Sequence, residues 1–269
     1  MFEDTAGAVA RRNIKLTLSY DGTGFHGFQR QSGHRTVQEA LEKAILRVTG
    51  EKVAVVGAGR TDAGVHALGQ VANFRTTSTV PVDRLPMALN VHFDREIAVY
   101  RAEEVAAGFH AQRSAIRKTY AYAIWVSPYP HPLLRLYTYH QPKPLDVAAM
   151  EAATPALVGT RDFTSFWSAG SVKTAPVRTV YDLSCRRERH EEQGGELVTF
   201  RITANGFLYR MVRNIVGFLL EVGRGQRGPD DAVRVLAAKD RQLAGRAAQA
   251  QGLCLMDVVY DEAPGGRAP

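Results

Sequence analysis

The stretch that decides the fold is residues 14–50, IKLTLSYDGTGFHGFQRQSGHRTVQEALEKAILRVTG. Its first seven residues alternate apolar and polar side chains, which is typical of a strand with one buried face. Thr36 and Glu39 match the capping-box pattern, apolar residues recur at helical spacing from 37 to 48, and Gly50 ends the run. The segment therefore predicts a strand, a glycine-rich loop and a helix.

The same patterns recur along the rest of the chain. Strands are predicted at 52–58, 70–76, 96–105, 117–126, 179–189, 196–207 and 252–260, and helices at 146–157, 208–222 and 229–241. The runs 179–189 and 196–207 flank a short polar segment, which predicts a hairpin. Hairpins interspersed with helices predict an α+β fold with mostly antiparallel sheet.

The charge balance favours a polyanionic partner. The chain has 34 Lys and Arg against 27 Asp and Glu, a formal net charge of +7. The basic residues cluster, and although any one cluster can be a solvated face, together they favour nucleic acid. The two cysteines are far apart and show no metal-ligand spacing, and no apolar run approaches a membrane span. These features predict a soluble, cytoplasmic protein, with residues 1–13 and 263–269 disordered.

Residues 57–74, GAGRTDAGVHALGQVANF, are unusually poor in packing residues for a scaffold segment. Four glycines surround Asp62, which is the only acid between Glu51 and Asp83, and Arg60 lies two positions before it. In an extended segment Arg60 and Asp62 point to the same face. Glycines permit positive φ or the close approach of a ligand. The pair is either a loop salt bridge or part of a reactive site.

Other catalytic motifs fail in context. Gly22, Gly24 and Gly27 have the spacing of a dinucleotide-binding loop, but no helix follows at once, so we expect a loop that approaches a ligand. Asp62 and His66 are four residues apart, but Gly64 disfavours the helix that would present both to a metal. The chain also lacks a nucleophile elbow and a P-loop lysine, which argues against common hydrolases and kinases.

The predicted helix at 208–222 carries a broad apolar arc. Arg213 lies at the border of this arc, whereas Arg210 and Asn214 are predicted on the opposite side. A border arginine can direct its guanidinium to a buried carboxylate or extend it to water. Tyr120 similarly alternates with Tyr122 and either packs within its strand or faces a ligand.

Several motifs in order resemble the tRNA pseudouridine synthases of the TruA type. They are SYDGTGFHGFQRQ (19–31), TVQEALEKA (36–44), the glycine-rich segment (57–74), FHAQRSAIRKTYAY (109–122), DFTSFWSAG (162–170) and FLYRMVRNIVGFLLEVGRG (207–225). The resemblance spans Ile14 to Tyr260. The chain departs from the family at Phe25 and Phe28, where Tyr and Trp are common, so contacts of that loop are expected to differ.

The resemblance implies an enzyme that isomerises uridines 38, 39 and 40 in the anticodon stem-loop of tRNA to pseudouridine, without cofactor or metal. Asp62 would be the catalytic residue, as nucleophile or base, Tyr120 would contact the target base, and Arg213 would pair with the aspartate. Arg60 would occupy the space vacated by a flipped base. Further expected substrate-binding residues are Arg117, Lys118 and Arg210.

The resemblance also implies a fold of two α+β lobes that share a continuous sheet around a central RNA-binding cleft. Residues 14–110 would form the lobe carrying Asp62, and residues 111–262 would complete the active site. The active form would be a homodimer that binds tRNA.

Two alternatives remain at this point. A non-catalytic binder or chaperone of structured RNA would share the basic clusters, but it gives no reason for the Arg60–Asp62 pair. A nucleotide-dependent oxidoreductase depends only on the spacing from Gly22 to Gly27.

Overall fold

The computed structural model describes residues 11–168 and 175–261, and its strands join in one sheet. The strand order is β4-β1-β3-β10-β5-β9-β8-β7, with β2 paired to β3 and β6 paired to β5. The strands are β1 (Arg12–Tyr20), β2 (Val56–Gly57), β3 (His66–Thr76), β4 (Ile97–Val105), β5 (Ala115–Val126), β6 (Tyr139–Gln141), β7 (Gly159–Asp162), β8 (Val177–His190), β9 (Gly195–Ala204) and β10 (Leu253–Tyr260). The β3–β10 and β5–β6 pairings are parallel and the others antiparallel, so the predicted α+β class is confirmed.

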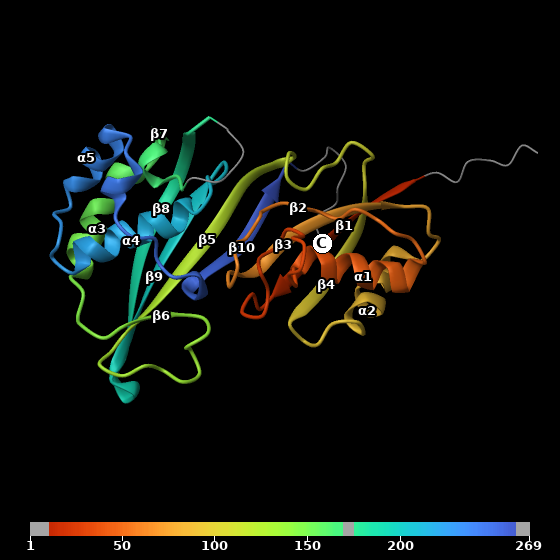
Figure 1. Cartoon of the computed structure of the whole chain (residues 1–269), viewed down its shortest axis with the longest axis horizontal. Helices are drawn as coiled ribbons and strands as arrows, with labels where there is room; N and C mark the ends of the chain where they lie inside the picture. Colours follow the sequence, from red (N-terminus) through yellow and green to blue (C-terminus); the bar gives the residue numbers. More distant parts are fainter. Residues whose placement is uncertain (1–10, 169–174, 262–269) are drawn as a thin grey trace, which may run out of the picture.

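The helices form two groups at opposite ends of the sheet (Figure 1). The first group is α1 (Val37–Thr49) and α2 (Leu85–Asn90), and the second is α3 (Val147–Ala153), α4 (Met211–Gly223) and α5 (Asp231–Ala238). β5 and β10 run between the groups. Among the described residues, none of these helices has the length and apolar character that a membrane crossing requires.

The strand and helix predicted from residues 14–50 both form. Ile14, Leu16 and Leu18 of β1 are fully buried, as the alternation predicts. α1 begins after Thr36, whose side chain accepts a hydrogen bond from the Glu39 N–H, and it ends at Gly50 with φ 76°. The Glu39 carboxylate pairs with Lys43 at 2.9 Å, so only the threonine half of the capping box forms.

The last strand of the chain joins the two halves of the sheet. β10 pairs with β3 through Cys254–His66 and Leu255–Ala67, and with β5 along most of its length. Gly69 of β3 allows this approach, because a Cβ there would lie 2.3 Å from the Met256 carbonyl oxygen. The cysteines of β8 and β10 are free and partly buried.

Some predicted boundaries were wrong. Arg12 and Asn13 belong to β1 instead of a disordered extension, and Asn13 donates hydrogen bonds to the carbonyls of Ala106 and Phe109. The strand predicted at 52–58 is reduced to β2. The helix predicted at 208–222 begins three residues later and ends one residue later, and the helix predicted at 229–241 is shorter at both ends. The tail at 263–269, with most of the predicted N-terminal extension, lies outside the described residues.

Asn214 also differs from the prediction, since its side chain is fully buried instead of facing away from the core. It donates to the Phe166 carbonyl at 2.7 Å and accepts from Arg241 at 2.8 Å. These hydrogen bonds satisfy a polar group that periodicity alone would place in solvent.

Candidate active site

The segment carrying Asp62 connects β2 to β3, and a buried glutamine holds its backbone. The Gln70 side chain accepts from the Gly59 N–H at 3.1 Å and donates to the Gly59 carbonyl at 2.8 Å. It also donates to the Tyr20 hydroxyl at 3.1 Å, and that hydroxyl lies 2.7 Å from Thr61 Oγ1. The residues just before Asp62 are thereby fixed to β1 and β3.

The glycine-rich loop after β1 packs against the same segment. A Cβ at Gly22 would lie 2.0 Å from the Val65 carbonyl oxygen, and one at Gly27, where φ is 86°, would lie 2.5 Å from that of Thr61. Gly22 and Gly27 therefore let the loop approach the backbone on either side of Asp62, and His26, Gln29 and Gln31 of the same loop line a cavity beside Asp62.

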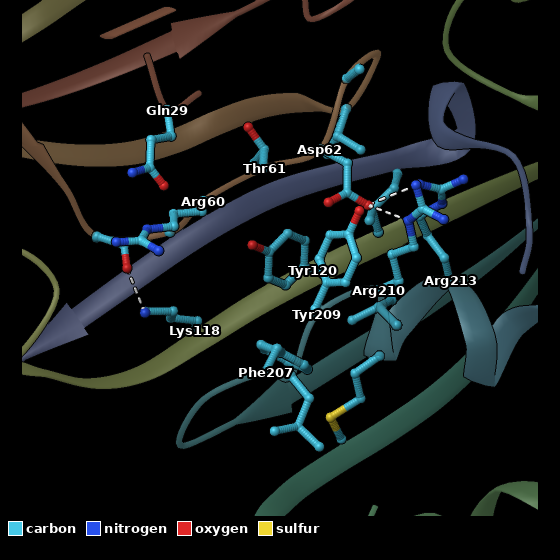
Figure 2. Close-up of a pocket in the computed structure, with 18 of the residues that line it drawn as sticks. Gln29, Arg60, Thr61, Asp62, Lys118, Tyr120, Phe207, Tyr209, Arg210 and Arg213 are labelled. Carbon is cyan, nitrogen blue, oxygen red and sulfur yellow. Dashed lines mark hydrogen bonds and ion pairs between the residues drawn. The ribbon is translucent and has the colours of Figure 1, made fainter. Parts of the chain in front are cut away.

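Asp62 forms an ion pair with the α4 arginine predicted for that role. Arg213 Nη1 lies 2.8 Å from Asp62 Oδ2, and Arg213 Nε donates to the Ala248 carbonyl at 2.8 Å. The side chains of Asp62 and Arg213 are only 16% and 14% exposed. Figure 2 shows Asp62 directed at Arg213 and Arg210. Partial burial and the ion pairs with Arg213 and Arg210 therefore orient the carboxylate of Asp62.

The backbone from Arg246 to Ala248 packs against α4 and fixes Arg213. Gly217 allows this segment to cross the helix, because a Cβ there would lie 1.9 Å from the Arg246 carbonyl oxygen. The Ala248 N–H donates to the Arg213 carbonyl at 2.8 Å. Ala248 therefore bonds both the backbone and the side chain of Arg213.

The helical pattern predicted that Arg210 points away from the core, and this prediction was wrong. It precedes the first residue of α4 in a left-handed conformation, with φ 59°, so the helical wheel does not apply to it. Its Nε lies 3.9 Å from Asp62 Oδ2, and its guanidinium lies 5.0 Å from the centre of the Tyr209 ring. Arg210 is thus a second, more exposed cation beside Asp62.

Tyr120 and Lys118, both on β5, line the cavity beside Asp62. Tyr120 is 7% exposed and contacts Phe207 edge to face at 5.0 Å. Burial, with Tyr20 and Asp62 nearby, raises the pKa of Tyr120 well above its ordinary value, so the phenol stays neutral at pH 7. Lys118 Nζ donates to the Ala58 carbonyl at 2.6 Å. Arg117 is exposed and does not line the cavity, because alternate residues of a strand face opposite sides.

The cavity has a volume of about 870 Å³ and a strongly basic lining. Its charged lining residues are Arg60, Asp62, Lys118, Arg178, Arg210 and Arg213. Asp62 is the only carboxylate in the lining drawn from the described residues. In the view of Figure 2, Arg60 and Lys118 lie at the opposite end from Arg210 and Arg213.

Two alternative roles for Asp62 disagree with the geometry. Its ion pairs are with Arg213 and Arg210, and exposed Arg60 has no ion-pair partner in the part of the chain that is described, so no loop salt bridge forms. His66 lies in a strand and bonds the Gly22 N–H and the Leu136 carbonyl. Across residues 11–168 and 175–261, no cluster of three or more His, Cys, Asp or Glu could hold a metal.

Comparison with known proteins identifies the family. The family model described as tRNA pseudouridine synthase matches residues 17–112 and 153–261. The chain belongs to the tRNA pseudouridine synthase family. It is 46% identical over 249 residues to tRNA pseudouridine synthase A of Thermoanaerobacter sp. (strain X514), covering 93% of this chain and 100% of that protein.

The enzyme is also 44% identical over 250 residues to tRNA pseudouridine synthase A of Bacillus subtilis (strain 168), covering 92% of this chain and 99% of that one. Among solved structures, the archaeal box H/ACA sRNP Nop10–Cbf5 complex overlaps 77% of this chain and 43% of its own, with TM-score 0.34 and 12% identity. A likeness that weak adds nothing to the argument.

Phe25 and Phe28, where the resemblance led us to expect Tyr and Trp, serve packing. Phe25 and Phe28 are each 2% exposed. The Phe28 ring lies against Gly57, where a Cβ would be 2.3 Å from it, and Arg35 lies 4.3 Å from the centre of the Phe25 ring. Both side chains therefore contact protein and not the cavity.

Sequence reasoning missed several residues of the synthase's site. Tyr20 and Gln70 form hydrogen bonds to the residues just before Asp62, and Phe207 and Arg178 line the cavity. The one available signal was Gln70, a polar residue in a predicted strand, since such a group requires hydrogen-bond partners when it is buried.

Removing the Gln70 side chain should destabilise the fold. Gln70→Ala leaves the N–H and carbonyl of Gly59 without partners in a buried site, so we expect the free energy of unfolding to fall by about 3 kcal/mol. Urea unfolding measures this, with Gln242→Ala, at an exposed position, as control. If the two variants were equally stable, the hydrogen bonds between Gln70 and Gly59 would have no structural role.

Proposed function

We propose that this enzyme isomerises uridines 38, 39 and 40 in the anticodon stem-loop of tRNA to pseudouridine, with Asp62 as the catalytic carboxylate and no cofactor. One observation carries the proposal. In a member of this family, the single carboxylate in the described lining of a basic cavity is held at 2.8 Å by a partly buried arginine. The wide basic lining suits an RNA substrate.

The reaction breaks the bond between N1 of uracil and C1′ of ribose, turns the base, and joins C5 to C1′. C5 loses its proton and N1 gains one, so the net change is an isomerisation. It needs a carboxylate beside C1′, as nucleophile or as base and electrostatic stabiliser. Arg213 and Arg210 both approach Oδ2 of Asp62, which leaves Oδ1 for the sugar.

The aromatic and cationic lining supports the base during this rearrangement. Tyr120 supplies a neutral phenol next to the carboxylate, and Phe207 supplies an apolar edge behind it. A uridine must leave its stack to reach Asp62. Arg60, an exposed residue of the cavity lining, would fill the vacated space.

The larger assembly follows the family expectation. We propose two lobes, residues 14–110 and 111–262, whose shared sheet borders a central RNA-binding cleft, and a homodimer that binds tRNA in the cytoplasm. The placement of Asp62 before β3 and of Tyr120 and Arg213 on later elements supports a site assembled from both lobes.

Loss of hydrogen from C5 tests the reaction class. The purified protein should release tritium to water from tRNA labelled at C5 of uridine, with no added cofactor and in the presence of chelator. Release should stay within about one equivalent per modified uridine. Retained label, or release that needs a nucleotide or a metal, would refute the proposal.

A further inference from the structure

Two cations in the cavity are left unused by the proposed chemistry. Lys118 on β5 pairs in register with Ala204 on β9, and Ala204 pairs with Val180 on β8. Arg178 lies two residues before Val180, and therefore on the same face of the sheet. Ala204, between them, is small and fully buried, so the long side chains of Lys118 and Arg178 extend over it into one cavity.

Both side chains keep hydrogen-bond donors available. Lys118 uses one of its three N–H groups on the Ala58 carbonyl. Arg178 uses Nη1 on the carbonyls of Ala175 and Val177, at 2.6 and 2.7 Å, and its Nε and Nη2 have no partner among the described residues. Neither residue forms an ion pair within the described ranges.

Holding these two cations together is unfavourable in the free protein. Burial, with Arg178 nearby, lowers the pKa of Lys118 to about 8. Burial also lowers the pKa of Arg178, although an arginine stays charged at neutral pH. A bound anion would relieve the repulsion and accept the unused N–H groups.

We propose that Lys118 and Arg178 form a phosphate clamp, which binds one backbone phosphodiester of the tRNA beside the flipped uridine. The inference rests on the proposed function, because that function brings RNA into the cavity. The strand rise places Lys118 about 7 Å from Tyr120 along β5. An anion at the clamp therefore lies next to the base site and not within it, as expected for a phosphate that flanks the target nucleotide.

Binding measurements with matched variants test the clamp. Asp62→Asn serves as background so that the RNA is not altered during the measurement. Lys118→Met and Arg178→Met should each weaken anticodon stem-loop binding about tenfold, and each should reduce the salt slope by about 0.7–0.9. Arg117→Met, next along β5 but on the opposite face, should change both quantities much less. Equal losses from Lys118→Met and Arg117→Met would overturn the clamp.

Neutral phosphates locate the contact. In a series of stem-loops, each with one methylphosphonate near the target uridine, one position should weaken binding to the background protein about tenfold. With the methylphosphonate at that position, Lys118→Met should cause no further loss of affinity, because the charge pair is already broken. With the methylphosphonate at any other position, Lys118→Met should still weaken binding. Additive losses at every position would mean that Lys118 acts only as a hydrogen bond to Ala58, and would overturn the proposal.

Lys118→Arg keeps the test valid if Arg178→Met folds poorly. Around Lys118 the charged or titratable lining groups are Arg178 on β8, Arg60 in the Asp62 segment and Tyr120 on its own strand. Above pH 8 Lys118 is largely neutral in the free protein, so phosphate binding must be coupled to the uptake of a proton from water by Lys118. Parent affinity should therefore fall from pH 7 to 9 more than that of Lys118→Arg. Identical pH profiles would contradict the clamp.

The proposed function is tested separately by product formation in the parent protein. If the parent forms pseudouridine but no phosphate couples to Lys118, only the clamp fails. If the parent forms none, the proposed function fails whatever the binding measurements show.

Discussion

We expect Asp62→Asn to bind folded tRNA at least nearly as well as the parent, and to form no detectable pseudouridine. The carboxylate faces a polyanion, so it contributes little to affinity or opposes it, whereas the basic lining supplies the attraction. The amide keeps the size of the side chain but removes the charge that the chemistry requires. The loss of turnover should be at least about 10⁴-fold, the scale of deleting a catalytic nucleophile.

A matched control separates chemistry from a general effect of charge. Asp257→Asn alters an exposed acid of β10 outside the cavity and should retain parental turnover and affinity. Appreciable turnover by Asp62→Asn would show that another group is the catalytic carboxylate. A parent that binds tightly but makes no product would instead favour a non-catalytic RNA-binding protein.

Arg213→Met should produce the second-largest loss. It removes the 2.8 Å partner of a carboxylate that is 16% exposed, and stranding a fully buried charge costs about 3–5 kcal/mol. Because water still reaches Asp62, we expect about 2–3 kcal/mol, or roughly 30- to 150-fold in kcat/KM. Single-turnover rates at saturating tRNA would show whether the loss is in the chemical step.

Two further variants sharpen this prediction. Arg213→Lys should recover only part of the loss, because one ammonium cannot bond both Asp62 and the Ala248 carbonyl as the guanidinium does. Arg210→Met should lose about tenfold, since Arg210 is 42% exposed and lies 3.9 Å from Asp62. Equal losses for Arg210→Met and Arg213→Met would mean that Arg213 has no special role in holding the carboxylate.

The parts of the fold predicted correctly are those determined by local pattern. β1 and α1 follow directly from alternation, a threonine cap and a terminal glycine, all within residues 14–50. The insertion of β10 between β3 and β5 has no local signal, because it depends on Gly69 allowing a strand from the far end of the chain to approach.

The candidate site divides in the same way. The border of the apolar arc left two directions open for Arg213, a buried carboxylate or water; the resemblance implied the carboxylate, and Arg213 lies 2.8 Å from Asp62. The direction predicted for Arg210 was wrong because the helix begins one residue after it. Strand alternation does not reveal which face of β5 meets the cavity, so the sequence could not show that Arg117 lies outside its lining. Arg178 was missed because it lies on β8, which reaches Lys118 only through the pairing of β8 with β9 and of β9 with β5.

The most direct test of the central claim is a position-resolved map of pseudouridine in unmodified tRNA that has uridine at 38, 39 or 40. After incubation with the parent protein, and with neither cofactor nor metal added, we expect pseudouridine at those positions and at no other uridine of the same tRNA. The Asp62→Asn protein should give no signal in the same tRNA. Pseudouridine confined to other positions, or undiminished product with Asp62→Asn, would contradict the account.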